Sequence, residues 1–216
     1  MSSSLIVTLD GPGGTGKSTV SRLVATRTGM PHLDTGAYYR AVTLAVLEAE
    51  VDPSDAEEVA RIAEAASLDQ EAGHMFLDGR DVSSEIRSQA VTAAVSAVSS
   101  HPDVRTRLVA LQREWIDRHG RRAVVEGRDI GSVVAPDAEV KVFLDASPRV
   151  RAQRRALETG DDEASVLIEL NRRDSFDSTR AASPLVVPEG AVVLDTSRLS
   201  VEEVVDTVLG LVAARS

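Results

Sequence analysis

Residues 11–18 constrain the fold of this chain more than any other segment. They read Gly-Pro-Gly-Gly-Thr-Gly-Lys-Ser and fit the phosphate-binding loop pattern, in which Gly, four residues, Gly and Lys precede a Ser or Thr. The apolar run at residues 5–9 predicts a buried strand before the loop, and residues 19–27 place apolar side chains at helical spacing after it. Strand, glycine-rich loop and helix are the context that this motif requires.

The chemistry of such a loop predicts an anion site. Glycines let the backbone turn sharply, so several N–H groups point into one concavity, and the helix N-terminus adds a partial positive charge of about half a unit. A glycine-rich turn that binds nothing is the alternative, but both flanks argue against it. We therefore expect nucleotide phosphates to contact Gly11, Pro12, Gly13, Gly14, Thr15, Gly16, Lys17, Ser18 and Thr19. In this motif the Lys17 ammonium reaches the outer phosphates and the Ser18 hydroxyl holds a magnesium ion.

Length and composition describe an ordinary globular chain. Its 216 residues are enough for one sizeable core with a small inserted lobe. The sequence has no cysteine, which excludes disulfides and thiolate metal sites and fits a reducing compartment. Residues 1–4 lack the basic region of a signal peptide, and no apolar run is long enough to span a bilayer. We expect a cytoplasmic protein, and a monomer because no exposed apolar helix face is evident.

The charge balance narrows the class of ligand. A net charge of −10 and a pI near 4.9 argue against general affinity for nucleic acid, while small anions in a local basic pocket remain possible. Lys17 and Lys141 are the only lysines, and arginine supplies the remaining basic side chains. His32, His74, His101 and His119 show no metal-ligand spacing and are interpreted as structural or surface residues.

Strand-like and helix-like segments alternate along the chain. After the first strand, strands are expected at residues 32–33, 123–126, 140–144 and 192–194. Helices are expected at residues 37–48, 54–66, 84–99 (weakly), 102–118, 148–158, 163–177 and 201–214. Residues 78–81 read Asp-Gly-Arg-Asp between apolar positions and predict a hairpin. This order predicts an α/β fold with a parallel sheet covered by helices on both faces, and a small insert that contains the hairpin.

The phosphate loop fixes the class of ligand but not the reaction, since GTPases, ATPases, motors and small-molecule kinases share it. A GTPase usually recognises guanine through the motif Asn-Lys-x-Asp. This chain lacks it, because its two lysines are Lys17, which belongs to the phosphate loop, and Lys141, which follows Val140. Arginines lie instead beyond strands and along helices. They fit a kinase whose second substrate is also a phosphate, because several negative charges must then be brought together.

Five segments together resemble bacterial cytidylate kinases. They are Leu-Asp-Thr-Gly-Ala-Tyr-Tyr-Arg at 33–40, Glu-Gly-Arg-Asp-Ile-Gly at 126–131, Phe-Leu-Asp-Ala-Ser at 143–147, Arg173-Asp174 with Asp177 and Arg180, and Ser-Pro-Leu at 183–185. The similarity runs from the first strand to residues 194–196 and so covers nearly the whole chain. It implies one phosphate-loop kinase domain over residues 1–216, with a monophosphate-binding insert at about 37–105 and a helical lid at about 148–180.

The resemblance also implies a reaction. The family transfers the γ-phosphoryl group of ATP to CMP or dCMP with magnesium, giving ADP and CDP or dCDP, in pyrimidine nucleotide metabolism. Residues expected to neutralise charge in that transfer are Lys17, Arg128, Arg173, Arg154 and Arg155. For the lid arginines, which include Arg151, the alternative is solvent exposure with an Arg154–Glu158 pair.

By the same resemblance the CMP site comprises Thr35, Tyr39, Arg40, Ser96, Arg105, Arg128, Asp129, Arg173, Asp177 and Arg180. The first three and Arg128 would hold the phosphate with Arg173, Asp129 would lie close by, Asp177 would bind the ribose, and Ser96, Arg105 and Arg180 would read the base. Ordinary alternatives stay open: a helix cap for Thr35, a buried Arg128–Asp129 pair, and a solvated ion pair on the helix of Arg173 and Asp177.

Two other acidic residues and two competing functions stay open. Asp10 and Asp34 would hold magnesium-bound waters or support Lys17, or else cap loops. A different small phosphate-loop kinase, acting on UMP, dTMP or a polyol acid, is the first competing function. A nucleotide-binding regulator that hydrolyses ATP slowly or not at all is the second.

Overall fold

The computed structural model describes residues 4–179 and 184–215, except the side chains of Asp177 and Thr179. The chain divides into two compact units. The first unit combines Met1–His32 with His119–Ser216, and the second unit is Leu33–Arg118. The expected insert at 37–105 lies within the sequence limits of the second unit, and the expected lid at 148–180 lies within those of the first.

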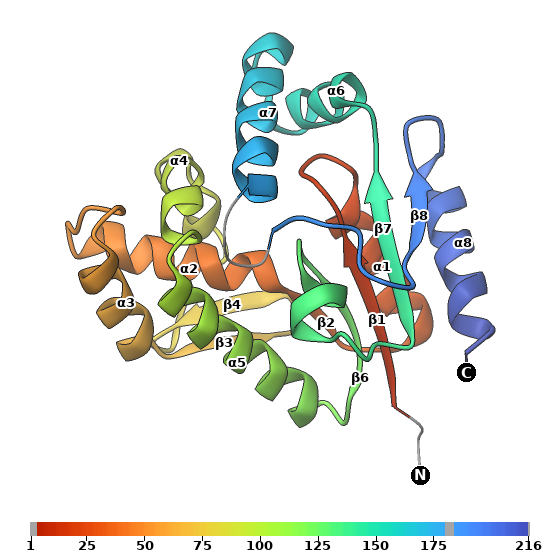
Figure 1. The fold of residues 1–216 in the computed structure, drawn as a ribbon, viewed down its shortest axis with the longest axis horizontal. Helices are drawn as coiled ribbons and strands as arrows, with labels where there is room; N and C mark the ends of the chain where they lie inside the picture. The colour runs from red at the N-terminus through yellow and green to blue at the C-terminus, as the bar shows by residue number, and fades with distance from the viewer. Residues whose placement is uncertain (1–3, 180–183, 216) are drawn as a thin grey trace. The chain divides into compact units, whose positions relative to one another are not determined.

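A five-stranded sheet carries the phosphate loop (Figure 1). Its order is β2 (His32–Asp34), β6 (Arg122–Glu126), β1 (Leu5–Asp10), β7 (Val140–Asp145) and β8 (Val192–Asp195). The pairings of β1 with β6, of β1 with β7 and of β7 with β8 are parallel. The carboxyl ends of these strands therefore meet at one edge of the sheet, which is where ligands bind in open α/β folds. The predicted α/β class with a central parallel sheet is confirmed.

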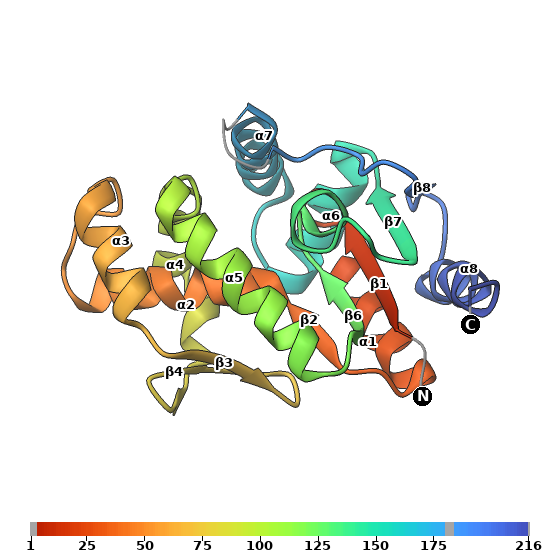
Figure 2. The ribbon, with the colours of Figure 1, turned by 60° about the horizontal axis from the view of Figure 1, so that its bottom comes forward.

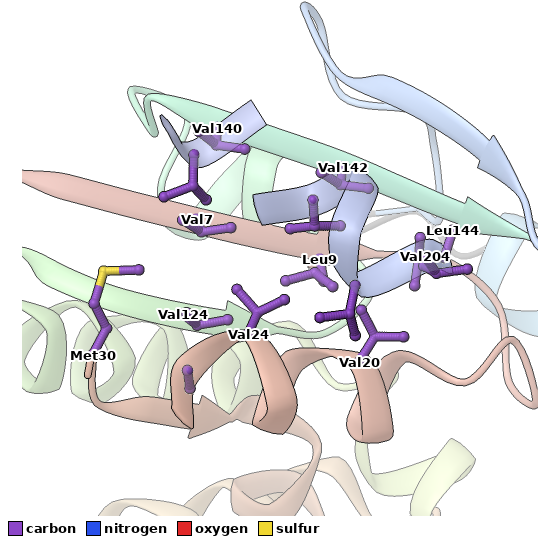
Figure 3. Packing of buried hydrophobic residues seen from close by; sticks show 14 of the residues in the cluster. Val7, Leu9, Val20, Val24, Met30, Val124, Val140, Val142, Leu144 and Val204 are labelled. Atoms are coloured by element: carbon purple, nitrogen blue, oxygen red, sulfur yellow. The ribbon is translucent and has the colours of Figure 1, made fainter. Parts of the chain in front are cut away.

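Two helices cover one face of this sheet. Helix α1 (Lys17–Thr28) and helix α8 (Val201–Ala213) bury aliphatic side chains against alternate residues of β1, β6 and β7 (Figure 3). The strands contribute Leu5, Val7, Leu9, Val124, Val140, Val142 and Leu144, and the helices contribute Val20, Val24, Ala25, Val204, Val205, Val208 and Val212. With almost no aromatic residues available, branched aliphatic side chains fill this core.

The remaining helices of the first unit lie beyond β7. Helix α6 (Pro148–Thr159) starts at Ser147, whose hydroxyl accepts from the Val150 N–H, and ends at Gly160 in the left-handed conformation. Helix α7 (Glu163–Thr179) packs against α6 through a small apolar cluster. After β6 the chain forms a π-helical turn at Ile130–Val134, which the sequence pattern did not predict.

The second unit combines helices with a small antiparallel sheet, whose strands β3 and β4 are seen side by side in Figure 2. Its helices are α2 (Thr35–Glu48), α3 (Ala56–Ala65), α4 (Gln89–Val98) and α5 (Pro102–Arg118), with a 3-10 turn at Glu85–Arg87. Its strands are β3 (Leu68–Glu71), β4 (His74–Leu77) and β5 (Arg80–Asp81). The side chains of Asp34 and Asp55 accept hydrogen bonds at the starts of α2 and α3, as expected of N-caps.

The predicted hairpin is confirmed, but two details of the second unit were wrong. A third strand, β3, pairs with β4 although its sequence Leu-Asp-Gln-Glu looks polar, because Leu68 and Gln70 are buried and the Trp115 indole donates to the Gln70 carbonyl at 2.8 Å. The single helix expected at 84–99 is broken at Ser88, which is extended and caps α4 by accepting from the Val91 N–H.

None of the helices in the described part of the chain combines the length and hydropathy needed to cross a membrane.

Replacing Leu9 with Ala tests the packing that holds the sheet to α1 and α8. Leu9 is fully buried in this cluster, so Leu9→Ala is expected to lower the free energy of unfolding by about 2–5 kcal/mol. Leu157→Ala is the matched control, because Leu157 is 87% exposed and should change stability by less than about 0.5 kcal/mol. Urea titrations of both variants decide, and equal losses would contradict the assignment of this core.

Candidate active site

The phosphate loop follows β1 and needs glycine at its first position. Gly11 has φ of 140°, and a Cβ there would lie 2.0 Å from the Leu144 carbonyl oxygen of β7. Gly14 and Gly16 also have positive φ, and Gly16 is the residue from which α1 begins. The backbone thus turns tightly over the end of β7 and presents the N-terminus of α1 to the loop, which is the geometry of an anion cradle.

Three cations bond three successive carbonyl groups of this loop. An Arg128 Nη donates to the Gly11 oxygen at 2.6 Å, the Lys17 Nζ donates to the Pro12 oxygen at 2.6 Å, and an Arg151 Nη donates to the Gly13 oxygen at 3.2 Å. These groups come from β6's end, α1 and α6 respectively. The arrangement concentrates positive charge around the loop, as stabilisation of a polyphosphate requires.

Burial makes Lys17 the most perturbed of these cations. The pKa of the Lys17 ammonium is lowered to about 7. Burial is the largest cause of this shift, and the charge of Arg128 is the second. The carboxylates of Glu126, Asp10 and Asp174 act in the opposite direction. At neutral pH the fraction of Lys17 that is charged therefore depends on the neighbouring carboxylates. A bound polyphosphate would favour the charged form further.

Glu126 was not selected from the sequence, yet it contacts the loop helix. The Ser18 hydroxyl donates to Glu126 Oε2 at 2.8 Å, and His32 Nε2 lies 3.1 Å from Glu126 Oε1. Burial raises the pKa of this carboxyl, but the His32 contact and charge, the Ser18 bond and Lys17 outweigh it and hold the pKa below its ordinary value. An acidic residue ending a buried strand, beside Gly-Arg-Asp, is the sequence signal that could have identified it.

The structure gives Asp10 an anchoring role. Its two carboxylate oxygens accept from the N–H groups of Ile130 and Gly131, both at 2.8 Å, which fixes the π-helical turn after β6. Burial raises the pKa of Asp10 to about 6 against these two bonds. Asp34, the second acidic candidate, caps α2 by accepting from the Ala37 N–H. Asp10 also favours the charged form of Lys17, and Asp34 also pairs with Arg87 at 3.6 Å.

The lid arginines separate into different environments. Arg154 reaches the Thr196 hydroxyl at 3.0 Å, the Thr196 carbonyl at 2.7 Å and the Thr15 carbonyl at 3.5 Å. Arg155 pairs with Glu158 at the surface, so the expected alternative pair with Glu158 forms one residue later than predicted. Arg151 is buried and pairs with Asp174 of α7.

The other candidates of the first unit are partly described. Asp129 is buried directly after Arg128, and Arg173 is half-buried on α7 beside Asp174. Asp177 lies on α7, and its side chain is outside the described residues, as is the whole of Arg180. Their predicted contacts with ribose and base therefore stay predictions.

The second unit brings several of its candidates together. Arg40 donates from one nitrogen to the Ile86 carbonyl and to the Thr92 hydroxyl, both at 3.0 Å. The Arg105 guanidinium lies over the Tyr39 ring, 5.2 Å from its centre, and donates to the Ser99 carbonyl. Thr35 is buried in the first turn of α2, and Ser96 is half-buried on α4. Neither the Thr92 nor the Ser99 contact was predicted.

Comparison with known proteins identifies the family. The sequence description of the cytidylate kinase family matches residues 7–214. Cytidylate kinase of Mycolicibacterium paratuberculosis is 53% identical, over 100% of this chain and 98% of that protein, and the enzyme of Rhodococcus opacus is 50% identical over 99% and 97%. The chain belongs to the cytidylate kinase family. The resemblance of the five segments is thereby confirmed.

The family reaction is phosphorylation of CMP with ATP, so this chain is an ATP-dependent nucleoside monophosphate kinase. Shikimate kinase of Acinetobacter baumannii shares the fold, with a TM-score of 0.51 and 15% identity over 98% of this chain and 94% of that one. That likeness concerns the fold alone. The family match therefore decides against the polyol-acid kinase and the non-catalytic regulator that the sequence left open.

The lowered pKa of Lys17 predicts that ATP binding takes up a proton. In the free protein this pKa is about 7, and the charge of bound phosphates raises it, so at pH 8 a largely neutral Lys17 amine takes up a proton on binding. Calorimetry in buffers of different ionisation enthalpy should show uptake approaching about one proton at pH 8 and little at pH 6. Affinity should fall as pH rises above 7. Lys17→Arg keeps its charge, and uptake that persists in this variant would contradict the assignment.

Proposed function

We propose that this kinase phosphorylates dCMP as well as CMP, with ATP bound as its magnesium complex at the phosphate loop. We also propose that it acts as a monomer in the cytoplasm. The absence of cysteine supports a reducing compartment, and the acidic net charge argues against nucleic acid as a partner. The observation that carries the nucleotide assignment is the loop at residues 11–18, with Lys17, Arg128 and Arg151 bonded to its carbonyl groups.

The residues at the start of α1 fit magnesium. Mg²⁺ prefers oxygen ligands, keeps several waters and is held in nucleotide sites by one or two protein groups together with phosphates. The exposed Ser18 presents a hydroxyl beside the Glu126 carboxylate, and the other loop residues bind phosphate through backbone N–H groups. We assign the metal to Ser18, and nucleotide contacts to the loop and Thr19. When bound, magnesium would neutralise phosphate charge as the γ-phosphoryl group transfers.

The CMP site is assigned residue by residue from the family pattern. In the second unit, Arg40 and Tyr39 are supported as phosphate ligands by their place in the first turns of α2, with Thr35 beside them. Ser96 and Arg105 are assigned to the cytosine edge, which needs planar donors at the carbonyl and ring nitrogen.

In the first unit, Arg128 and Arg173 are assigned to phosphate, with Asp129 close by. Asp177 is assigned to the ribose and Arg180 to the base.

Transfer needs positioning and charge neutralisation, with little covalent work by the protein. An oxygen of the CMP phosphate bonds to the γ-phosphorus while the bond from that phosphorus to the bridging oxygen of ATP breaks, and ADP leaves. Lys17, Arg128 and Arg173 offset the charge that gathers on the transferring group. Arg154 and Arg155 supply further positive charge from α6, which requires Arg155 to leave its surface pair with Glu158.

A panel of acceptors tests the substrate assignment. Initial rates of ADP release should be high with CMP and dCMP, and at least about tenfold lower in kcat/KM with UMP, AMP or shikimate, because a missing base contact leaves buried polar groups unpaired. Preference for any acceptor other than a cytidine nucleotide would contradict the base-site assignment. Low activity with dCMP alone would remove only the deoxynucleotide from the proposal.

Replacing Arg40 tests the phosphate site of the second unit. Arg40→Gln removes a guanidinium from the CMP phosphate, so KM for CMP should rise at least about tenfold while KM for ATP stays within about twofold. Arg61→Gln is the control, since Arg61 is paired with Glu58 at the surface of α3 and its loss should leave both constants unchanged. An Arg40 variant with an unchanged KM for CMP would remove Arg40 from the site.

A further inference from the structure

A closed ring of hydrogen bonds lies at the first turn of α1. It is formed by the side chains of Ser18, Ser21, His32 and Glu126 and by the Ser18 carbonyl. His32 Nε2 lies 3.1 Å from Glu126 Oε1 and 3.0 Å from Ser21 Oγ. The Ser21 hydroxyl donates to the Ser18 carbonyl at 3.3 Å, and the Ser18 hydroxyl donates to Glu126 Oε2 at 2.8 Å. His32, which the sequence analysis interpreted as structural or surface, therefore touches both a carboxylate and the helix that carries Lys17.

The chemistry of the ring fixes where its protons lie. Glu126 is ionised and only accepts, so His32 Nε2 must carry a proton to contact it favourably. The Ser21 hydroxyl donates its proton to the Ser18 carbonyl, so its oxygen can accept only from the same His32 Nε2–H. The Ser18 hydroxyl proton goes to the other oxygen of Glu126. Each donor then has an acceptor. The His32 imidazole donates to the Glu126 oxygen that Ser18 does not contact.

The hydrogen bonds of this ring are shielded from water because most of its side chains are buried. The side chains of His32 and Glu126 are only 13% and 4% exposed, and Ser21 is fully buried, so water competes poorly for the ring. Ser18 is exposed, while its hydroxyl donates to Glu126 and its carbonyl accepts from the Ser21 hydroxyl. The Arg22 Nε also donates to that carbonyl at 2.9 Å. The ring thus orients the first turn of α1 while leaving its outer side accessible.

We propose that His32 is a positioning residue for the ATP end of the reaction. By donating to Glu126 it fixes the carboxylate whose second oxygen orients the Ser18 hydroxyl. His32 itself contacts neither substrate in this assignment. The inference rests on the proposed role of Ser18, and it adds an outer partner of the kind that orients ligands at metal–nucleotide sites.

The test compares two substitutions that differ in one hydrogen-bond donor. His32→Leu removes the donor, whereas His32→Gln places an amide N–H near the position of Nε2. Binding of magnesium–ATP and of CMP is measured separately by calorimetry, and KM and kcat are measured for both substrates. Loss of an outer-shell partner typically weakens a site by about 10–100-fold, so His32→Leu should weaken magnesium–ATP binding by at least about tenfold. CMP binding should stay within about twofold, and His32→Gln should recover most of the loss.

Controls separate this role from a purely structural one. His101→Leu removes another histidine, one that contacts the Pro53 carbonyl in the second unit, and it should leave magnesium–ATP binding unchanged. If His32→Leu does not fold, His32→Asn replaces it, because its shorter amide falls short of Glu126. His32→Gln should then bind magnesium–ATP more tightly than His32→Asn.

Three results would overturn the inference: wild-type magnesium–ATP affinity in His32→Leu, equal losses for ATP and CMP, or equal affinities in the donor and non-donor variants. Ser18→Ala distinguishes failure of the proposed function from failure of this inference. If Ser18→Ala leaves the magnesium dependence of ATP binding unchanged, the role proposed for Ser18 is wrong. If Ser18→Ala weakens binding and His32→Leu does not, only the role of His32 is wrong.

Discussion

The site depends on keeping one ammonium group out of water beside the phosphate loop. The pKa of Lys17 is lowered to about 7, mainly because the ammonium is buried and in part because it is repelled by the charge of Arg128. Three carboxylates, of Glu126, Asp10 and Asp174, act against that shift. Once charged, a buried ammonium attracts a polyphosphate strongly, because little water screens the interaction and the ligand supplies negative charge that favours the ammonium form.

The fold holds this charge balance through contacts that lie at the carboxyl end of the sheet. Asp10 ends β1 and fixes the π-helical turn through two backbone N–H groups, and Arg128 lies between that turn and the end of β6. Gly11 lets the loop pass within contact distance of the Leu144 carbonyl, where any side chain would collide with backbone. The aliphatic core under α1 and α8 keeps the strands that carry these groups in register. The chemistry therefore depends on packing that contributes no polar atom to the site.

Much of this arrangement could be predicted from the sequence, because the decisive signals are local. The phosphate loop at 11–18, the alternation of strands and helices and the turn at Asp78-Gly79 each depend on neighbouring residues, and all were confirmed. The misses depend on contacts between distant segments. Strand β3 looks polar until Trp115 reaches Gln70, and the helix break at Ser88 depends on capping geometry.

In the candidate site, too, local signals were predicted and contacts between distant segments were missed. Lys17 follows from the motif, but Glu126 and His32 are joined only when β2, β6 and α1 are assembled, and no spacing along the chain reveals that. Arg151 was not among the residues expected to neutralise charge, since helical periodicity does not show which arginine reaches the loop. The substrate roles of Asp177 and Arg180 remain predictions from the family pattern.

The titration of Lys17 tests this account most directly, and the sequence makes it unusually accessible. The chain has two lysines, so a sample labelled at lysine Cε gives two side-chain NMR signals, which Lys141→Arg assigns. The account predicts that the Lys17 signal of the free protein titrates with a pKa of about 7 and moves to a higher pKa when ATP binds. A Lys17 signal that titrates at the ordinary lysine value near 10.4 in the free protein would contradict it.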